Sequence, residues 1–291
     1  MADLEVTTGR CTCRVTDHGA QVLGWAPTGE SPVLWLSSSA VFADDVAIRG
    51  GIPICFPWFG SGRSGALTPA HGFARLVPWH RISSTDDDGV VTVVHELAPP
   101  MGSCADFPYS YRAVLTARFG ERLDLALAIH NEGEVAFDYE AALHTYLAVA
   151  DATALRIEGL EGAPYLDKVT GAARVQDGPI TISGEVDRVY RSDGTVVVVD
   201  TIGARRIVVA KDGSRSTIVW NPGRDRARAL ADFGDEDWNS MVCVETANVG
   251  DESICLEPGA SHRMTLQVSV ESMHHDGAAR SPRPEAPECS T

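Results

Sequence analysis

The 291-residue chain is poor in positive charge: 24 Lys and Arg stand against 40 Asp and Glu, a formal net charge of −16. Proteins that bind nucleic acid or anionic membranes concentrate Lys and Arg, so this composition argues against both classes of partner. The sequence has no unbroken run of about 18 apolar residues, and its N-terminus lacks a basic segment followed by an apolar stretch. We therefore expect a cytoplasmic monomer whose partners are small molecules, and any anionic ligand must meet a local cluster of arginines.

The sequence also lacks the cysteine and histidine spacings that are typical of metal sites. The seven cysteines form no CxxC pair, and their odd number favours free thiols in a reducing compartment over a disulfide framework. A metal-dependent β-sandwich enzyme would need histidines clustered at strand spacing, such as His-x-His, and no such pattern occurs outside the C-terminal tail. Because this pattern is missing, we expect no metal site.

Helical periodicity is scarce, being visible only around 224–231, where Asp225 would cap the start. Alternation of period two, which is typical of half-buried antiparallel strands, is much more frequent. In 123–130, large apolar side chains on one face alternate with small or polar side chains on the other. A turn at 131–134 and a further strand-like stretch at 137–149 predict a hairpin.

Six more segments are predicted strands, because they are short, rich in β-branched residues and separated by Gly, Asp, Asn and Pro. They are 89–95, 195–200, 206–210, 216–220, 241–245 and 262–270. Since no helix follows each strand and no repeat of roughly 20 to 50 residues is present, we predict an all-β sandwich of two large antiparallel sheets. One domain is expected over 1–272, followed by a disordered tail over 273–291 that is rich in Pro, Ala and charge.

Several segments have compositions that a generic core does not explain. RGGIPICFPWFG, residues 49–60, combines two prolines, three glycines and three aromatic residues with one arginine. This composition indicates backbone in special conformations around a concave, apolar wall. HGFAR puts His71 and Arg75 four residues apart, and YLDK, residues 165–168, is predicted to present a carboxylate and an ammonium in a loop.

Two side chains on predicted strands are candidates for acid/base chemistry. His144 shares a strand face with Tyr146, and an imidazole with a pKa of about 6.5 can act as acid or base near neutrality. Glu245 ends an apolar strand beside Cys243, where an unpaired charge is costly, so it should have a partner or a raised pKa. Structural roles are the alternatives: a core histidine bonded to backbone, and a salt-bridge partner at the rim.

Other charged residues allow plain structural roles as well. Arg49 and Arg75 are as compatible with surface ion pairs as with ligand binding. The acidic stretch 232–237 lacks the alternation and the terminal Glu of an EF-hand loop, so we predict a solvated loop without calcium.

Taken together, the motifs resemble those of one family. RGGIPICFPWFG, HGFAR, LHTYLAVAD, YLDK, VWNPG and MVCVETANV occur in this order between residues 49 and 249. This set resembles the hexose-6-phosphate mutarotases, or glucose-6-phosphate 1-epimerases, of the galactose mutarotase-like superfamily. The resemblance implies an antiparallel β-supersandwich with an open carbohydrate cleft on one sheet.

The resemblance also implies roles for particular residues. His144 and Glu245 match the catalytic pair of the family, and Arg49, Arg75 and Asp167 match positions that bind substrate. Anomer exchange then needs two proton transfers: Glu245 takes the proton of the C1 hydroxyl while protonated His144 donates to the ring oxygen. Asp167 would accept from sugar hydroxyls, and the two guanidiniums would hold the 6-phosphate. No metal or organic cofactor is expected.

One position departs from the family pattern. Members can carry a Gln just before the histidine of HGxAR that binds the sugar phosphate, whereas this chain has Ala70. The change removes an amide donor, and His71 is the candidate to replace it in substrate binding. The expected substrate is a hexose 6-phosphate; the alternatives are an aldose 1-epimerase acting on unphosphorylated sugars and a non-catalytic carbohydrate-binding module.

Overall fold

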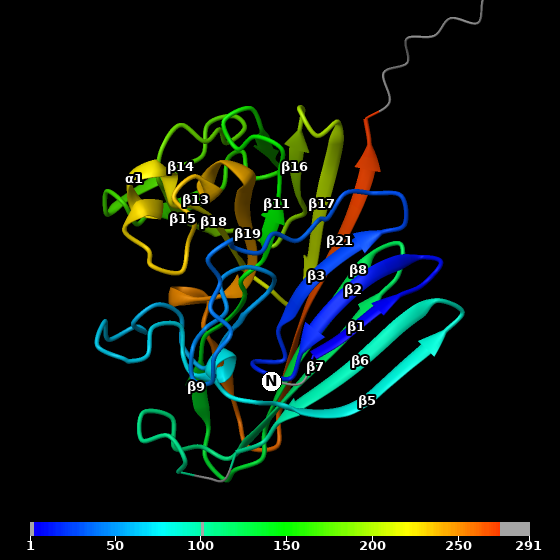
Figure 1. Ribbon diagram of the computed structural model, residues 1–291. Helices are drawn as coiled ribbons and strands as arrows, with labels where there is room; N and C mark the ends of the chain where they lie inside the picture. Colours follow the sequence, from blue (N-terminus) through cyan, green and yellow to red (C-terminus); the bar gives the residue numbers. More distant parts are fainter. Residues whose placement is uncertain (1–2, 100–101, 274–291) are drawn as a thin grey trace, which may run out of the picture.

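A computed structural model describes residues 3–99 and 102–273, which are built mainly from antiparallel β-sheets (Figure 1). The first large sheet has the order β14-β13-β15-β18-β19-β10-β4, and β11 also pairs with β19. Its strands are β4 (Ile54–Cys55), β10 (Ala141–Leu143), β11 (Tyr146–Ala148), β13 (Pro164–Asp167), β14 (Ala172–Val175), β15 (Val186–Arg191), β18 (Ser216–Asn221) and β19 (Met241–Asn248).

The second large sheet has the order β12-β16-β17-β21-β8-β7-β6-β5. Its strands are β5 (His80–Asp87), β6 (Val90–Leu97), β7 (Tyr111–Phe119), β8 (Leu123–Asn131), β12 (Arg156–Glu158), β16 (Val196–Asp200), β17 (Arg205–Asp212) and β21 (Ser261–Ser272). Two smaller sheets contain β1 (Asp3–Thr7), β2 (Cys11–Thr16) and β3 (Val22–Pro27), and β9 (Phe137–Tyr139) with β20 (Ile254–Leu256). The predicted all-β, antiparallel architecture is confirmed.

The two large sheets share one hydrophobic core. On β8 the alternating residues Leu123, Leu125 and Leu127 enter it, and on β19 Val242 and Val244 enter the same cluster. Burying each such side chain contributes about 1.5 to 3 kcal/mol relative to leaving it in water. Because alternation commits only one face of each strand to this core, the opposite face of the first sheet is available for other contacts.

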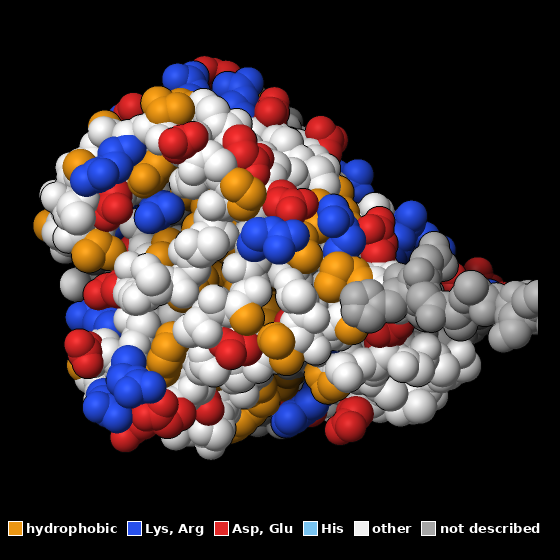
Figure 2. Space-filling view, turned by 90° about the horizontal axis from the view of Figure 1, so that it is seen from above, with side chains coloured by type: hydrophobic (Ala, Val, Ile, Leu, Met, Phe, Trp, Pro, Cys, Tyr) orange, Lys and Arg blue, Asp and Glu red, His pale blue; other side chains and the backbone are white. Residues whose placement is uncertain are grey.

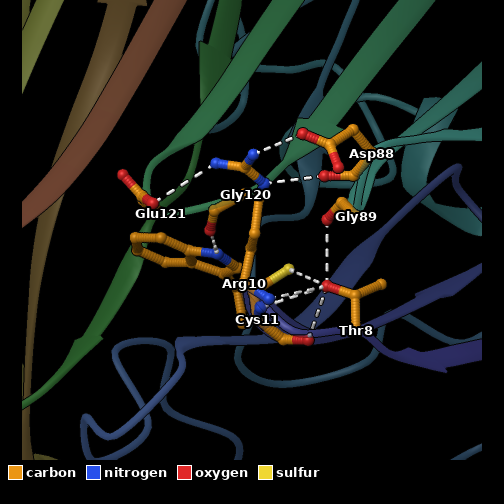
Figure 3. Close-up of polar contacts among 8 residues, drawn as sticks. Thr8, Arg10, Cys11, Asp88, Gly89, Gly120 and Glu121 are labelled. Carbon is orange, nitrogen blue, oxygen red and sulfur yellow. Dashed lines mark hydrogen bonds and ion pairs between the residues drawn. The ribbon is translucent and has the colours of Figure 1, made fainter.

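Polar contacts join the N-terminal sheet to the hairpin ends of the second large sheet (Figure 3). Arg10 donates from Nε to the Asp88 carbonyl and from Nη2 to its carboxylate, both at 2.7 Å, and from Nη1 to Glu121 at 3.3 Å. Thr8 Oγ1 donates to the Gly89 carbonyl at 2.9 Å. Since Asp88 and Glu121 are exposed, these ion pairs contribute about 0 to 1 kcal/mol each and mainly orient the two sheets.

The six further predicted strands are found as β6, β16, β17, β18, β19 and β21, with ends shifted by at most three residues. The predicted hairpin is wrong. β8 pairs with β7 and β21, whereas 137–149 is divided among β9, β10 and β11, which pair with β20, β4 and β19. Hydrophobic alternation decides which face of a strand is buried, but it does not select the neighbouring strand.

Two local predictions need correction. The helix expected over 224–231 is α1 (Gly223–Arg228), and Pro222 rather than Asp225 occupies its N-cap position. The YLDK segment is not a loop, since Tyr165 to Asp167 belong to β13. No helix within residues 3–99 and 102–273 is long and apolar enough to cross a membrane. Apart from Met273, the expected tail lies outside the described residues, and the single domain over 1–272 stays a prediction.

Candidate active site

The face of the first sheet that points away from the core carries Glu245. On β19 the side chains of Met241, Cys243 and Glu245 alternate with the core residues Val242 and Val244. Successive side chains of a strand point to opposite faces, so Glu245 lies on the side opposite the core. β19 is nevertheless covered along its whole length, and Glu245 is only 1% exposed.

His144 lies directly across from Glu245 in the same sheet. It occupies the short gap between β10 and β11, and the registers of both strands on β19 put it opposite Glu245. The Nε2 atom of His144 is 3.4 Å from Oε1 of Glu245. The imidazole stacks on the Tyr146 ring at 4.7 Å between centroids, with 14° between the planes. The predicted couple is thus a contacting pair with an oriented imidazole.

Each member of this pair also has a buried polar atom without a partner. Nδ1 of His144 and Oε2 of Glu245 have no hydrogen-bond partner among the described residues. A buried polar atom left in this state costs about 1 to 3 kcal/mol, so such atoms are rare in stable folds. A polar ligand beside Glu245 would supply the missing bond.

Burial favours the neutral form of both groups. Loss of solvation raises the pKa of Glu245 well above its ordinary value, and the nearby carboxylate of Asp187 adds to the rise. Loss of solvation also holds the pKa of His144 well below its ordinary value, and neighbouring basic groups add to the fall. The pair by itself therefore favours a neutral carboxyl beside a neutral imidazole, and it holds one proton that either group can carry.

A cavity of about 350 Å³ opens over the pair. Five of the six residues predicted for the site line it: Arg49, His71, Arg75, His144 and Glu245. These residues are spread over almost 200 positions of the sequence, and the first sheet with its loops brings them together. The cavity wall thus combines the His144–Glu245 pair with several cationic side chains.

Asp167, the sixth predicted residue, is not among the residues that line this cavity. Its carboxylate accepts a hydrogen bond from the backbone N–H of Thr170 at 2.9 Å and lies 3.9 Å from Nε of Arg188. Asp187 on the adjacent strand β15 lines the cavity instead and forms an ion pair with Lys168 at 3.3 Å. The YLDK motif indicated a segment that does contribute Lys168 to the cavity. The strand register, however, decides which carboxylate faces the cavity.

His71 is held in a strained backbone with one ring nitrogen occupied. Its φ is 66°, and the following Gly72, at φ 71°, packs so tightly that a Cβ would collide with the Phe56 carbonyl. The backbone N–H of Gly60 donates to Nδ1 of His71 at 3.3 Å, so a neutral His71 carries its proton on Nε2. Burial lowers the pKa of His71 to about 3, with Arg75 and other cations adding, so it acts as a neutral donor.

Arg49 has its charge balanced inside the protein. Nε and Nη2 of Arg49 donate to the two carboxylate oxygens of Asp232, each at 3.1 Å, and Nη1 donates to the Tyr146 hydroxyl at 3.1 Å. The prediction that 232–237 is a solvated loop is therefore wrong at Asp232. It is also wrong at Phe233, which is buried, and at Asp237, which accepts hydrogen bonds from Ser38. Sequence alone did not reveal the Arg49–Asp232 pair, because its members are far apart in the chain.

Arg75 has more free hydrogen-bonding capacity. Nη2 donates to the Ala70 carbonyl at 2.8 Å, and Nε is buried without a partner among the described residues. No carboxylate in the described part of the chain lies within ion-pair distance of Arg75. This guanidinium can therefore accept an anion with little rearrangement.

Trp220 and Arg226 are, like Asp187, among the lining residues that were not predicted as site residues from the sequence. The Trp220 ring meets the rings of His144 and Tyr146 edge-on, at 6.1 Å in both cases. VWNPG marked this segment, but only its contact with β19 brings Trp220 to the site. Within residues 3–99 and 102–273, no group of three His, Cys, Asp or Glu residues could hold a metal ion.

The sequence also matches a known family. A family model described as aldose 1-epimerase matches residues 3–269. The chain belongs to the aldose 1-epimerase family. As a member of this family, the protein is an isomerase that interconverts the α and β anomers of an aldose, and its expected enzymatic class is confirmed.

Curated relatives of this aldose 1-epimerase family member match over most of their length. A relative from Escherichia coli (strain K12) is 36% identical over 256 residues, which are 87% of this chain and 85% of the relative. A relative from Cenchrus ciliaris is 35% identical over 276 residues, which are 89% of this chain and 82% of the relative. Both carry the name "Putative glucose-6-phosphate 1-epimerase".

Solved structures agree with the fold of the epimerase. A Salmonella typhimurium protein described as a "putative mutarotase" superposes with a TM-score of 0.86 at 30% identity, covering 93% of this chain and 90% of that one. A "galactose mutarotase-like protein" from Clostridium acetobutylicum gives a TM-score of 0.72 at 13% identity, covering 93% and 95%. The latter likeness concerns the fold alone, and the predicted galactose mutarotase-like β-supersandwich is confirmed.

Proposed function

We propose that the protein is a glucose-6-phosphate 1-epimerase, which exchanges the anomers of glucose 6-phosphate by opening and reclosing the pyranose ring. The observation that carries the proposal is the His144–Glu245 pair, with Nε2 and Oε1 3.4 Å apart, at a cavity that also holds Arg75. An acid/base couple beside a guanidinium suits a sugar hemiacetal that carries an anionic group. The names of the curated relatives support the same substrate.

The proposed mechanism moves two protons. Glu245 as carboxylate takes the proton of the C1 hydroxyl, and protonated His144 gives a proton to the ring oxygen. The bond between C1 and the ring oxygen breaks, and C1 becomes an aldehyde carbon. After rotation about the C1–C2 bond, the same transfers run in reverse and close the ring from the other face. The proton count of the pair is unchanged over the cycle, and each positioned group contributes about 10²- to 10⁴-fold.

Substrate binding itself prepares the charged form of the pair. A sugar hydroxyl that donates to the unpartnered Oε2 of Glu245 favours the carboxylate, because a hydrogen bond to the charged form stabilises it. A phosphate dianion in the same cavity favours the imidazolium form of His144. Both effects oppose the desolvation that keeps the two groups neutral without substrate. The imidazolium–carboxylate form is therefore favoured when the sugar phosphate is bound.

Other lining residues orient the sugar. We assign to Asp187, in place of Asp167, the role of accepting from sugar hydroxyls, since Asp187 lines the cavity. His71 donates through Nε2, and Arg49, which is paired with Asp232, supplies N–H donors rather than net charge. These contacts fix the ring relative to the acid/base pair, which is a large source of rate acceleration.

Magnetisation-exchange NMR on equilibrated glucose 6-phosphate tests the proposal directly. We expect the wild-type protein to accelerate exchange between the α and β anomeric signals, also in the presence of a chelator. The matched control is the Glu245→Gln variant at the same concentration. Exchange no faster than in buffer would contradict the function.

Free glucose in the same experiment tests the main alternative. Acceleration on glucose but not on glucose 6-phosphate would identify an aldose 1-epimerase for unphosphorylated sugars, and binding without exchange would indicate a carbohydrate-binding module. A monomeric state and a cytoplasmic location stay predictions from the sequence.

A further inference from the structure

The cations around the cavity differ in whether they have a carboxylate partner. Four cationic side chains line it, namely Arg49, Arg75, Lys168 and Arg226. Arg49 and Lys168 form ion pairs at 3.1 and 3.3 Å. Arg75 and Arg226 have no carboxylate within ion-pair distance in the described part of the chain. These two guanidiniums are thus the ones whose charge is available to an anionic ligand.

Arg226 differs from the other two arginines of α1. Arg224 and Arg228 both pair with Glu236, at 3.8 and 3.2 Å. These two residues are four positions apart and share one side of the helix, whereas Arg226 between them points to another side. Only Arg226 of the three lines the cavity. The helix therefore separates one ligand-facing arginine from two that are engaged elsewhere.

The start of the helix that carries Arg226 is anchored to Asn221, the last residue of β18. The Asn221 side chain donates to the Met241 carbonyl at 2.8 Å and accepts from the Gly223 N–H at 2.8 Å, just where α1 begins. Gly223 has a φ of 62°, and a Cβ there would collide with the backbone of Glu185. The start of α1 is thus fixed on the site, while the Arg226 side chain remains exposed and can reach toward a ligand.

The overall surface charge cannot replace such a local contact. Figure 2 shows basic and acidic groups interspersed over the face seen from above, and the whole chain carries −16. Glu185, an exposed carboxylate, also lines the cavity and repels an anion. Charges farther than about 8 Å are largely screened at physiological ionic strength. An anionic substrate therefore depends on guanidiniums that touch it.

We propose that Arg226 binds the phosphate of the sugar phosphate together with Arg75, and that it sets the preference for phosphorylated over free aldoses. This inference rests on the proposed function and deepens it by naming a specificity residue on α1. Arg226 offers paired charge-assisted hydrogen bonds that a sugar hydroxymethyl group cannot exploit fully. Its contribution therefore appears in the comparison of the two substrates.

The test compares Arg226→Ala with the matched control Arg228→Ala, which removes the same charge from the same helix. The quantity measured is the kcat/KM of anomer exchange for glucose 6-phosphate divided by that for glucose. We expect this ratio to fall about 10- to 100-fold in Arg226→Ala, mainly through KM, and to stay at the wild-type value in Arg228→Ala. Arg226→Lys should retain part of the preference.

Three results would overturn the inference: an unchanged ratio in Arg226→Ala, equal losses on both substrates, or the same fall in Arg228→Ala. Calorimetric binding of glucose 6-phosphate separates this inference from the proposed function. If the wild type binds glucose 6-phosphate without exchanging its anomers, the proposed function is refuted. In that case, weaker binding by Arg226→Ala but not by Arg228→Ala still supports the inference. A wild type that neither binds nor exchanges it overturns both.

Discussion

The most informative perturbation of the proposed mechanism is Glu245→Gln. The amide keeps the volume and the hydrogen-bonding capacity of the side chain but cannot exchange a proton with the sugar. Glu245 is 1% exposed and lies 3.4 Å from His144. Neither water nor a carboxylate ion from solution can therefore easily take over its proton transfer. We expect kcat for anomer exchange to fall about 10²- to 10⁴-fold, equivalent to about 3 to 5 kcal/mol of activation free energy.

The same substitution should stabilise the fold relative to the wild type as pH rises. The folded-state pKa of Glu245 lies well above its unfolded value, so the native state binds more protons than the unfolded state in the window between the two. Wild-type stability from this group is therefore complete below the unfolded pKa and declines as pH rises through the folded one. Glutamine removes this decline, while His144 is present in both proteins.

Two measurements check these expectations. Magnetisation-exchange NMR gives the exchange rate, and urea unfolding at several pH values gives the free energy of unfolding. Glu252→Gln is the control, because Glu252 is also a poorly exposed glutamate but pairs with Arg191 at 2.7 Å and does not line the cavity of the His144–Glu245 pair. Near-normal exchange in folded Glu245→Gln, or a stability difference that does not grow in its favour with pH, would refute the reasoning.

Three further predictions concern the same cavity. His144→Ala should lower exchange about 10²- to 10⁴-fold with the far-UV circular dichroism unchanged; near-normal exchange would remove His144 from the mechanism. The second prediction concerns the pH profile of kcat/KM, corrected for ionisation of the substrate phosphate. Activity should fall in acid only well below pH 6.5, where both Glu245 and His144 are protonated, and in alkali once the pair has lost its single shared proton. An acid limb centred at pH 6.5 would contradict the buried pair. Arg75→Ala should reduce kcat/KM for glucose 6-phosphate about tenfold more than for glucose, and equal losses in parallel assays would discredit its phosphate role.

The candidate pair illustrates what sequence patterns can predict. Strand patterns assigned both His144 and Glu245 to strands; Glu245 lies in β19, whereas His144 occupies the gap between β10 and β11. The apolar neighbours of Glu245 predicted a partner or a raised pKa, and both are found. The motif set further indicated the family and five of the residues that line the cavity. These features depend on local composition and on side-chain direction along one strand.

The contacts of Asp187, Asp232 and Arg226 were not predictable in this way. Each depends on which distant segments pack together: β13 against β15, the 232–237 stretch against Arg49, and the start of α1 against Glu185. The wrongly predicted hairpin has the same origin, since many strands of similar alternation could pair with β8. Nothing in a local pattern distinguishes among these partners.

The sequence by itself determined that this chain is an all-β protein with one buried face per strand, and it determined the chemical types available to a site. Tertiary structure alone decided that His144 lies opposite Glu245. It also decided that the charge of Arg49 is balanced by Asp232, whereas Arg226 has no ion-pair partner in the described part of the chain. The physical reason is that local preferences act over a few residues, whereas strand register and ion pairing join residues separated by up to almost two hundred positions, so they exist only once the sheets have packed.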